Sequence, residues 1–412
     1  MPTQPDAPLR TTPLDAVHRR LGATTGPFAG WEMPMRYGNE REEHIAVRTK
    51  AGLFDLFHTG EITVSGIQAA EALDHALVGN ISALATGRAL YTMICAENGG
   101  ILDDLIVYRT GEREYLVAAN ARNAETVLAE LTARAAPYPG AKVRDDRDTY
   151  ALVAIQGPEA AAIIAPLAGV DLEYYGVRHG TVAGTDALIA RTGYTGEDGF
   201  ELYVAAEAAE AMWNILTEAG TSHGLVPAGM ACRDTLRLEA GMPRYGHELT
   251  PAITPFDAGR GHVVHFNKTT NKGRFIGRDA LIRAAEAAHK YPLRKLVGLV
   301  STGEQSPRTG FPVVNKQGAK VGEVTSGALS PTLVIPIAIA YLETAHAETG
   351  THVAVNIHGK HERYKVVALP FYRRPSAPVP ASARPKYLGA AHRQQLTSHR
   401  PHRQPAASSP EH

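Results

Sequence analysis

Three clusters of charged residues lie within otherwise apolar parts of the sequence. Asp103 and Asp104 follow a glycine turn, and Glu201 follows a second, glycine-rich turn. Arg233 begins the third cluster, which also contains carboxylates. A charged group in a segment that should be buried is kept only where a partner, a ligand or a chemical step compensates its desolvation. The three clusters are therefore the candidates for binding a polar ligand and for electrostatic catalysis.

Asp104 and Glu201 stand at the start of two strands that we predict to be equivalent parts of a duplicated unit. Pseudo-symmetric halves would bring the two acids to opposite sides of one central cleft. The alternative is that both acids are exposed turn residues, which is the usual position of an acid beside glycine. Alternation along the strand does not decide between Asp103 and Asp104, because both faces of residues 105–108 are apolar.

The third cluster has helical spacing, so Arg233 and Arg237 are expected on one side of a helix. One interpretation is a surface set of ion pairs with Asp234 and Glu239, and we favour it for Arg237. Arg233 lies beside the small residue Cys232 at the start of the helix. This position fits a buried guanidinium that binds a planar anion or carbonyl equally well.

A mixed α and β region must position these clusters. Turn residues separate short apolar runs into an antiparallel meander, and a helix is predicted after Asn120, which is a good helix cap. Further along the chain a similar order of strands and helix recurs, which indicates a duplicated β-β-α unit. The predicted strands are 91–95, 105–108, 115–119, 187–190 and 200–204, and the second helix runs through residues 212–216.

The C-terminal part of the chain has a different pattern. Short apolar runs separated by Gly, Pro and Asn turns, from residue 294 to residue 372, predict a small β-barrel or sandwich. Residues 375–412 are rich in Pro, Ala, Ser, Gln, His and Arg, and this composition predicts a disordered tail.

Length, charge and cysteine content limit the classes of function. The 412 residues exceed what one hydrophobic core usually supports, so two or three domains are expected. The 42 Lys and Arg balance the 42 Asp and Glu, which argues against nucleic acid or a membrane as partner. Cys95 and Cys232 have no metal-ligand neighbourhood, so neither a disulfide framework nor a metal site is expected. Without a signal peptide or a long apolar run, the sequence predicts a soluble, cytoplasmic protein.

Residues 12–374 resemble the glycine cleavage system T-protein family, the aminomethyltransferases. The matching strings are long and spread over the chain, which makes the resemblance more specific than a single glycine motif. They are residues 28–34, 43–48, 99–108, 190–203, 232–241, 245–249, 254–259, 324–327 and 369–374.

The resemblance implies an α+β, multi-domain fold. A folate-binding domain, a ferredoxin-like domain and a C-terminal β-barrel would surround a central tetrahydrofolate channel. The implied parts are an N-terminal segment of the folate-binding domain at 1–50, the folate-binding region with two pseudo-repeated α+β units at 51–290, the barrel at 291–374 and the tail at 375–412.

The resemblance also implies a one-carbon transfer with tetrahydrofolate as co-substrate. The family moves the aminomethyl group from the lipoyl arm of the H-protein, a transient partner, to tetrahydrofolate. The products are 5,10-methylenetetrahydrofolate, ammonia and the reduced lipoyl arm. Asp104 matches the family's key aspartate, which faces the folate nitrogens and stabilises the cationic centre as ammonia leaves. Glu201 matches the acid that binds the pterin edge, and Arg233 matches the arginine beside it.

Three further residues are weaker matches to folate-binding positions. Tyr91 and Asn120 lie near the site of the first domain, and Tyr372 belongs to a segment that the family returns from the barrel toward the pocket. Either tyrosine could instead be a core residue with a satisfied hydroxyl group.

The sequence departs from the family pattern at three notable positions. Phe57 stands where a serine is usual and Thr59 where a methionine is usual, and both would reshape the site if their loop lines it. Val334 stands where a glycine is usual, and valine takes a positive φ only with difficulty. These changes keep open an alternative function, a tetrahydrofolate-dependent methyl or hydroxymethyl transferase or demethylase that acts on a small metabolite.

Other classes of function have less support in the sequence. A non-enzymatic folate-binding relative that serves cluster assembly or repair is disfavoured, because Asp104 is present and no Lys-Gly-Cys-Tyr signature occurs. No glycine motif of a dinucleotide-binding fold and no P-loop is present either.

Overall fold

The computed structural model describes residues 8–375 except residues 170, 291–293 and 302. Apart from Pro375, the predicted tail lies outside the described residues. The helices are α1 (Asp15–Arg20), α2 (Glu40–Thr49), α3 (Ala69–Ala76), α4 (Ala124–Ala135), α5 (Ala160–Ala168), α6 (Ala209–Gly220), α7 (Met230–Glu239) and α8 (Arg278–Lys290). The strands are β1 (Arg10–Thr11), β2 (Thr24–Phe28), β3 (Trp31–Arg36), β4 (Ala51–Asp55), β5 (Gly60–Ser65), β6 (Ala89–Cys95), β7 (Ile101–Gly111), β8 (Glu114–Ala119), β9 (Lys142–Asp145), β10 (Tyr150–Gln156), β11 (Val177–Val182), β12 (Thr185–Ala190), β13 (Gly199–Ala205), β14 (Leu225–Pro227), β15 (Arg294–Val300), β16 (Pro312–Val314), β17 (Lys320–Leu329), β18 (Pro336–Glu343), β19 (His352–Ile357) and β20 (Lys360–Val367).

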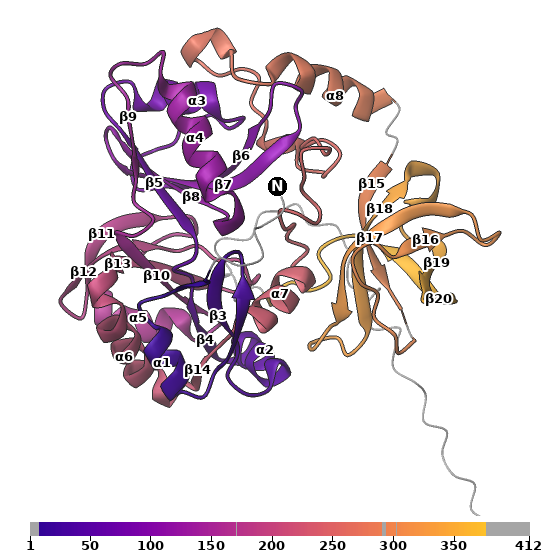
Figure 1. The fold of residues 1–412 in the computed structure, drawn as a ribbon, viewed down its shortest axis with the longest axis horizontal. Helices are drawn as coiled ribbons and strands as arrows, with labels where there is room; N and C mark the ends of the chain where they lie inside the picture. The colour runs from indigo at the N-terminus through magenta and orange to yellow at the C-terminus, as the bar shows by residue number, and fades with distance from the viewer. Residues whose placement is uncertain (1–7, 170, 291–293, 302, 376–412) are drawn as a thin grey trace, which may run out of the picture. The chain divides into compact units, whose positions relative to one another are not determined.

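A six-stranded sheet with the order β11-β12-β13-β10-β4-β14 carries the largest core cluster (Figure 1). Its strands pair antiparallel except β14, which runs parallel to β4. The central strand β10 is apolar along nearly its whole length because both of its faces are buried. Helix α6 places Met212, Trp213 and Leu216 against this core at helical spacing, as the sequence predicts.

A second, five-stranded sheet has the order β6-β7-β8-β5-β9 and is covered by α3 and α4 (Figure 1). Helix α4 buries Val127 and Leu131, one turn apart, in the core of this sheet. Strands β4 and β5 are consecutive in the chain but belong to different sheets. The short segment 56–59 therefore connects the two sheets, and its side chains lie where the sheets meet.

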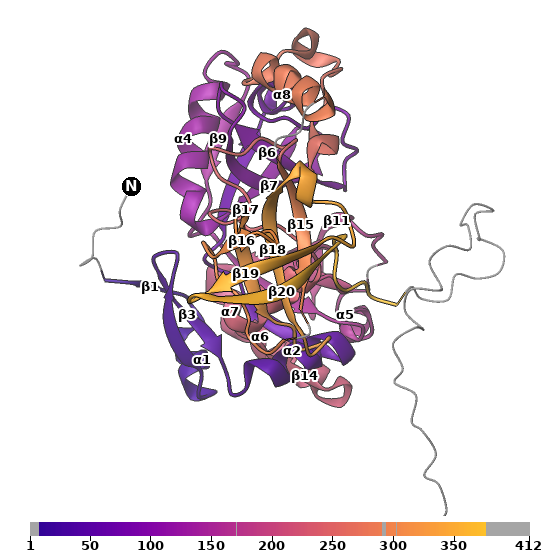
Figure 2. The same ribbon diagram turned by 90° about the vertical axis from the view of Figure 1, so that its right-hand side faces the viewer.

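The C-terminal strands form a closed barrel with the order β15-β18-β17-β16-β19-β20, drawn in orange and yellow in Figure 2. Alternating residues fill its interior, among them Leu299, Val355 and Val366, which are fully buried. The predicted choice between barrel and sandwich is thereby resolved in favour of a barrel. Closure leaves no free sheet edge among these strands.

The predicted meander is confirmed, because β6, β7 and β8 pair antiparallel in sequence order. The predicted equivalence of the strands that carry Asp104 and Glu201 is wrong. Asp104 lies on β7, which is separated from α4 by β8, whereas Glu201 lies on β13, which leads directly into α6. The two acids therefore lie on strands that do not occupy equivalent positions in the two units: Asp104 is on the second strand before the helix, and Glu201 is on the last strand before it.

Among the described residues, no helix is long and apolar enough to cross a membrane.

Candidate active site

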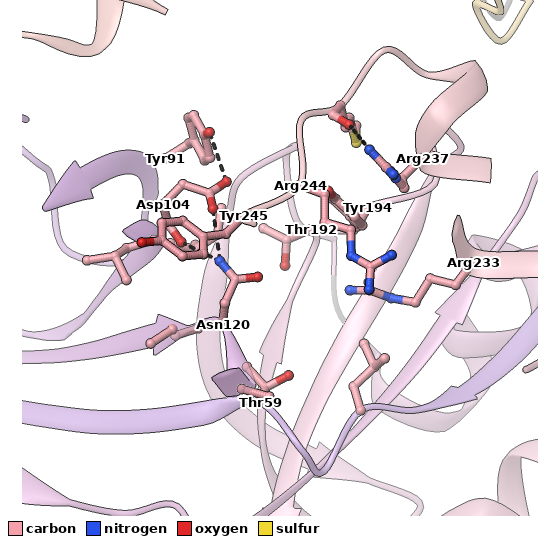
Figure 3. A pocket seen from close by; sticks show the side chains of 18 of the residues that line it. Thr59, Tyr91, Asp104, Asn120, Thr192, Tyr194, Arg233, Arg237, Arg244 and Tyr245 are labelled. Carbon is pink, nitrogen blue, oxygen red and sulfur yellow. Dashed lines mark hydrogen bonds between the residues drawn. The ribbon is translucent and has the colours of Figure 1, made fainter. Parts of the chain in front are cut away.

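One cavity of about 370 Å³ brings together five of the residues predicted from the sequence, four of which, Tyr91, Asp104, Asn120 and Arg233, are labelled in Figure 3. Its walls come from the second sheet, the first sheet, α7 and the segments that connect them. The predicted residues that line it are Tyr91, Asp104, Asn120, Glu201 and Arg233. The volume lies in the range of ordinary small-molecule sites.

Asp104 is held by hydrogen bonds from both sides (Figure 3). The Tyr91 hydroxyl on β6 donates to Asp104 Oδ2 at 3.0 Å, and Asn120 Nδ2, at the end of β8, donates to Oδ1 at 2.8 Å. Antiparallel pairing of β6, β7 and β8 places all three side chains at the cavity wall. Burial raises the pKa of Asp104, and the two hydrogen bonds oppose this effect.

The neighbouring Asp103 faces the opposite way and is fully buried. It accepts hydrogen bonds from the backbone N–H and Nδ2 of Asn120, at 3.0 and 2.9 Å, and from Asn123 Nδ2 at 2.8 Å. Burial, together with the charge of Asp104, raises the pKa of Asp103 to about 8. The choice between the two acids that alternation leaves open is therefore settled: Asp104 faces the cavity, and Asn120 contacts both.

Glu201 lines the cavity, and one of its two carboxylate oxygens is bound to protein. Its Oε2 accepts hydrogen bonds from the Tyr108 hydroxyl at 2.9 Å and from the Thr192 hydroxyl at 2.5 Å. In the described part of the chain, no donor is bonded to Oε1. This oxygen is available to a ligand that carries N–H groups.

Arg233 projects from the first turn of α7 into the cavity (Figure 3). It makes no hydrogen bond or ion pair within the described residues, and its guanidinium carbon lies 4.7 Å from the centre of the Tyr194 ring. Burial lowers the pKa of Arg233. The guanidinium of Arg244 lies beside it in Figure 3 and is bonded to Asp234 at 3.2 Å. Arg233 is therefore a cation with unused donors.

The interpretation of Arg237 as part of a surface ion-pair set is wrong. Its side chain is only 1% exposed, although it does pair with Asp234 at 2.9 Å as predicted. The second partner is the buried Glu248, at 3.0 Å. Glu239 does not pair with Arg237 but with His44 and Arg48.

Tyr372 does not line the cavity. Its ring packs against the guanidinium of Arg48, 4.0 Å from the ring centre, and its backbone N–H donates to the Glu239 carbonyl oxygen at 2.8 Å. The structure thus brings five of the six predicted site residues together and leaves Tyr372 at a separate cluster.

The loop that departs from the family pattern reaches the cavity only in part. Thr59 and its neighbour His58 line the cavity, whereas Phe57 is buried with its ring 5.3 Å from that of Trp31. Burial lowers the pKa of His58 to about 3, so this side chain is neutral at physiological pH. Phe57 therefore adds no ring to the cavity wall.

Sequence reasoning missed several residues of the cavity wall, namely Tyr108, Thr192, Tyr194 and His58. Three of them lie inside the strings that carry the family resemblance, but nothing in their residue type indicates a partner. Across the described residues, no three His, Cys, Asp or Glu side chains are grouped as a metal site.

Two family models match the chain. The GCVT N-terminal domain matches residues 14–268, and the glycine cleavage T-protein C-terminal barrel domain matches residues 294–373.

Relatives of known identity match nearly the whole described chain. An aminomethyltransferase of Streptomyces coelicolor is 63% identical over 370 residues, which cover 89% of this chain and 98% of the relative. An aminomethyltransferase of Moorella thermoacetica is 46% identical over 373 residues, which cover 90% and 99%. The crystal structure of glycine cleavage system aminomethyltransferase T from Bartonella henselae superimposes with a TM-score of 0.82 at 37% identity, over 89% of this chain and 99% of that one.

The alignments extend across both sheets, the cavity and the barrel, at identities that establish common descent. The chain belongs to the glycine cleavage T-protein family of aminomethyltransferases.

Proposed function

We propose that the cavity binds tetrahydrofolate and catalyses its reaction with an aminomethyl group carried on the lipoyl arm of an H-protein. The C–S bond to the lipoyl arm and the C–N bond to the amino group both break, and the carbon becomes bonded to both folate nitrogens, whose two protons pass to the thiol and to the ammonia. Ammonia and the reduced lipoyl thiol leave. The observation that carries the proposal is the presence, in one cavity, of the half-buried Asp104 carboxylate and of two groups without a hydrogen-bond partner among the described residues, one Glu201 oxygen and the Arg233 guanidinium.

The free groups of the cavity match the polar edge of a pterin ring. A pterin carries adjacent ring N–H and amino donors, which Glu201 Oε1 can accept, and a carbonyl oxygen that suits a guanidinium. The rings of Tyr194, beside Arg233, and of Phe28, beside Arg244, supply apolar parts of the cavity wall. Arg233 is desolvated by burial and makes no hydrogen bond among the described residues, so a complementary ligand supplies interactions that this guanidinium lacks in the free protein.

Asp104 would act on the charge that develops during the transfer. As ammonia departs, positive charge accumulates on the transferred carbon and on the nitrogen that remains bonded to it. A carboxylate fixed in a low-dielectric wall stabilises that charge without having to reorganise. Tyr91 and Asn120 hold both oxygens of Asp104 as acceptors, so these two residues orient the carboxylate.

The alternative, transfer of a methyl or hydroxymethyl group to or from a small metabolite, is favoured by a single observation. Thr59 lines the cavity, where a short polar side chain changes the surface offered to the donor. Phe57, the other departure in this loop, is buried away from the cavity and gives no support.

The test is a turnover assay of the purified protein with tetrahydrofolate and aminomethylated H-protein. Ammonia and 5,10-methylenetetrahydrofolate should form in equal amounts, and calorimetry should detect folate binding in the absence of H-protein. Folate binding without turnover would reject the H-protein as donor and favour the alternative. Absence of folate binding would reject the proposed function altogether.

A further inference from the structure

We propose that Tyr108 and Thr192 are positioning residues that donate hydrogen bonds to Glu201 Oε2. Glu201 then accepts hydrogen bonds from both donors of its ligand with the single oxygen Oε1. The inference rests on the proposed function, because it specifies how the same cavity recognises a folate. It differs from the simplest expectation for a carboxylate and a pterin edge, in which each carboxylate oxygen accepts one donor.

The arrangement depends on three strands from two sheets. Tyr108 is on β7 of the second sheet, Glu201 is on β13 of the first sheet, and Thr192 follows β12. The Tyr108 hydroxyl is 2.9 Å from Glu201 Oε2, and the two hydroxyl groups of Tyr108 and Thr192 are 3.2 Å apart. The contact therefore joins the two sheets in the wall of the cavity.

A second tyrosine supports the first. Tyr203 follows Glu201 by two positions on β13, so both side chains are on one face of the strand. The Tyr203 hydroxyl donates to the Tyr108 hydroxyl at 3.3 Å, and the two rings meet edge to face with centres 5.7 Å apart. Both tyrosines are 1% exposed. With its own acceptor site used by Tyr203, Tyr108 is left with its proton for Glu201.

Counting acceptor sites gives the consequence for a ligand. A carboxylate oxygen has two lone-pair sites, and those of Oε2 are used by Tyr108 and Thr192. Among the described residues Oε1 has two unused sites, and Glu201 lines the cavity. Two neighbouring N–H donors of a ligand must therefore both point at Oε1, unless one hydroxyl first gives up its contact.

The competing explanation is that Tyr108 is a core residue whose buried hydroxyl merely finds an acceptor. The two explanations differ in their dependence on pH. A hydroxyl that donates to a carboxylate interacts more strongly with the ionised than with the protonated acid, so its contribution to affinity depends on pH. A role in packing alone would change affinity equally at every pH.

The experiment measures tetrahydrofolate affinity from pH 5 to pH 8 for the full-length protein and for Tyr108→Phe and Thr192→Val. Each substitution removes one donor and keeps the size of the side chain. At neutral pH each variant should bind folate about tenfold more weakly, the scale of one hydrogen bond to a charged group. The difference in affinity between each variant and the wild type should change with pH.

Tyr115→Phe is the matched control. Tyr115 is also 1% exposed, but it lies in the core of the second sheet, and its hydroxyl has no partner among the described residues. This variant should bind folate like the wild type. Because both Tyr108→Phe and Thr192→Val are measured, the test remains decisive if one of these two variants fails to fold.

The possible failures are distinguishable. If the wild type binds folate and both Tyr108→Phe and Thr192→Val bind it with unchanged affinity, or with a loss that is the same at every pH, the positioning role is rejected alone. If the wild type binds no folate at any pH, the proposed function and this inference are rejected together.

Discussion

Asp104 shows how one strand can separate two adjacent acids. Asp103 points away from the cavity and accepts hydrogen bonds from three N–H donors. Asp104 lines the cavity, where Tyr91 and Asn120 each donate to one of its two oxygens. The period of two along a strand makes this separation unavoidable once one of the acids is buried. Only the cavity-facing acid can stabilise charge on a bound substrate.

Asp104→Asn should lower kcat by about 100-fold or more, because the variant keeps the shape of the side chain but removes the negative charge near the transferred carbon. Folate affinity should change by less than about threefold, since Glu201 and Arg233 are unaffected. Steady-state turnover and calorimetric titration measure the two quantities.

Asp186→Asn, on the exposed surface of β12, is the matched control and should leave both quantities unchanged. Full turnover by Asp104→Asn would remove Asp104 from the mechanism. A large loss of folate affinity would instead place it among the residues that bind the ground state.

At the scale of elements, the loop between β17 and β18 accepts a residue that is poorly suited to its backbone. Val334 has φ +58° and is 59% exposed. A left-handed conformation brings Cβ too close to the following carbonyl oxygen, and the cost is roughly 1–2 kcal/mol. The loop is held in place by Ser330 and Thr332, which contact Glu239.

Val334→Gly should therefore raise the free energy of unfolding by about 0.5–1 kcal/mol. The relief of strain exceeds the additional chain entropy that glycine loses on folding, which is roughly 0.5–1 kcal/mol. Urea unfolding measures the difference. Leu333→Gly, at the preceding position with no positive φ, should lower stability. Equal losses in both variants would contradict the strain at Val334.

The elements around the cavity are largely predictable because their signals are local. The meander, α4, α6 and the barrel all follow from apolar periodicity and from turn residues. The roles of individual side chains depend on distant partners instead. Tyr108 acts on Glu201, 93 residues away, and Arg237 is buried because Ser326, 89 residues away, and Glu248 bind it. Tyr372 was expected at the cavity, but its ring packs against the guanidinium of Arg48 instead.

At the scale of the whole described chain, Glu239 at the end of α7 joins three distant segments. Its carboxylate contacts His44 at 3.0 Å and Arg48 at 3.1 Å, both on α2, and accepts a hydrogen bond at 2.8 Å from Thr332 in the barrel loop. Ser330 binds the other oxygen. Arg233, in the first turn of α7, lines the cavity, so this cluster also holds the helix that carries Arg233.

The pH dependence of stability should report this cluster. Burial alone would raise the pKa of Glu239, but the hydrogen bonds from His44 and Ser330 and the charge of Arg48 outweigh burial and lower it from 4.5 to about 2. An acid whose pKa is lowered by folding stabilises the folded state above its unfolded-state pKa. That stabilisation is lost as the pH falls from about 4.5 toward the folded-state value.

Glu239→Gln should lower the free energy of unfolding by about 3 kcal/mol at pH 7, which corresponds to the size of the pKa shift and includes the loss of one of the two carboxylates that pair with the buried Arg48. The deficit should shrink as the pH falls below 4.5, because the wild type then loses the same contribution. Urea unfolding at several pH values between 7 and 3 measures it, with the exposed Glu112→Gln as control. A deficit that stays constant down to pH 3 would show that packing, and not the charge on Glu239, holds α2, α7 and the barrel loop together.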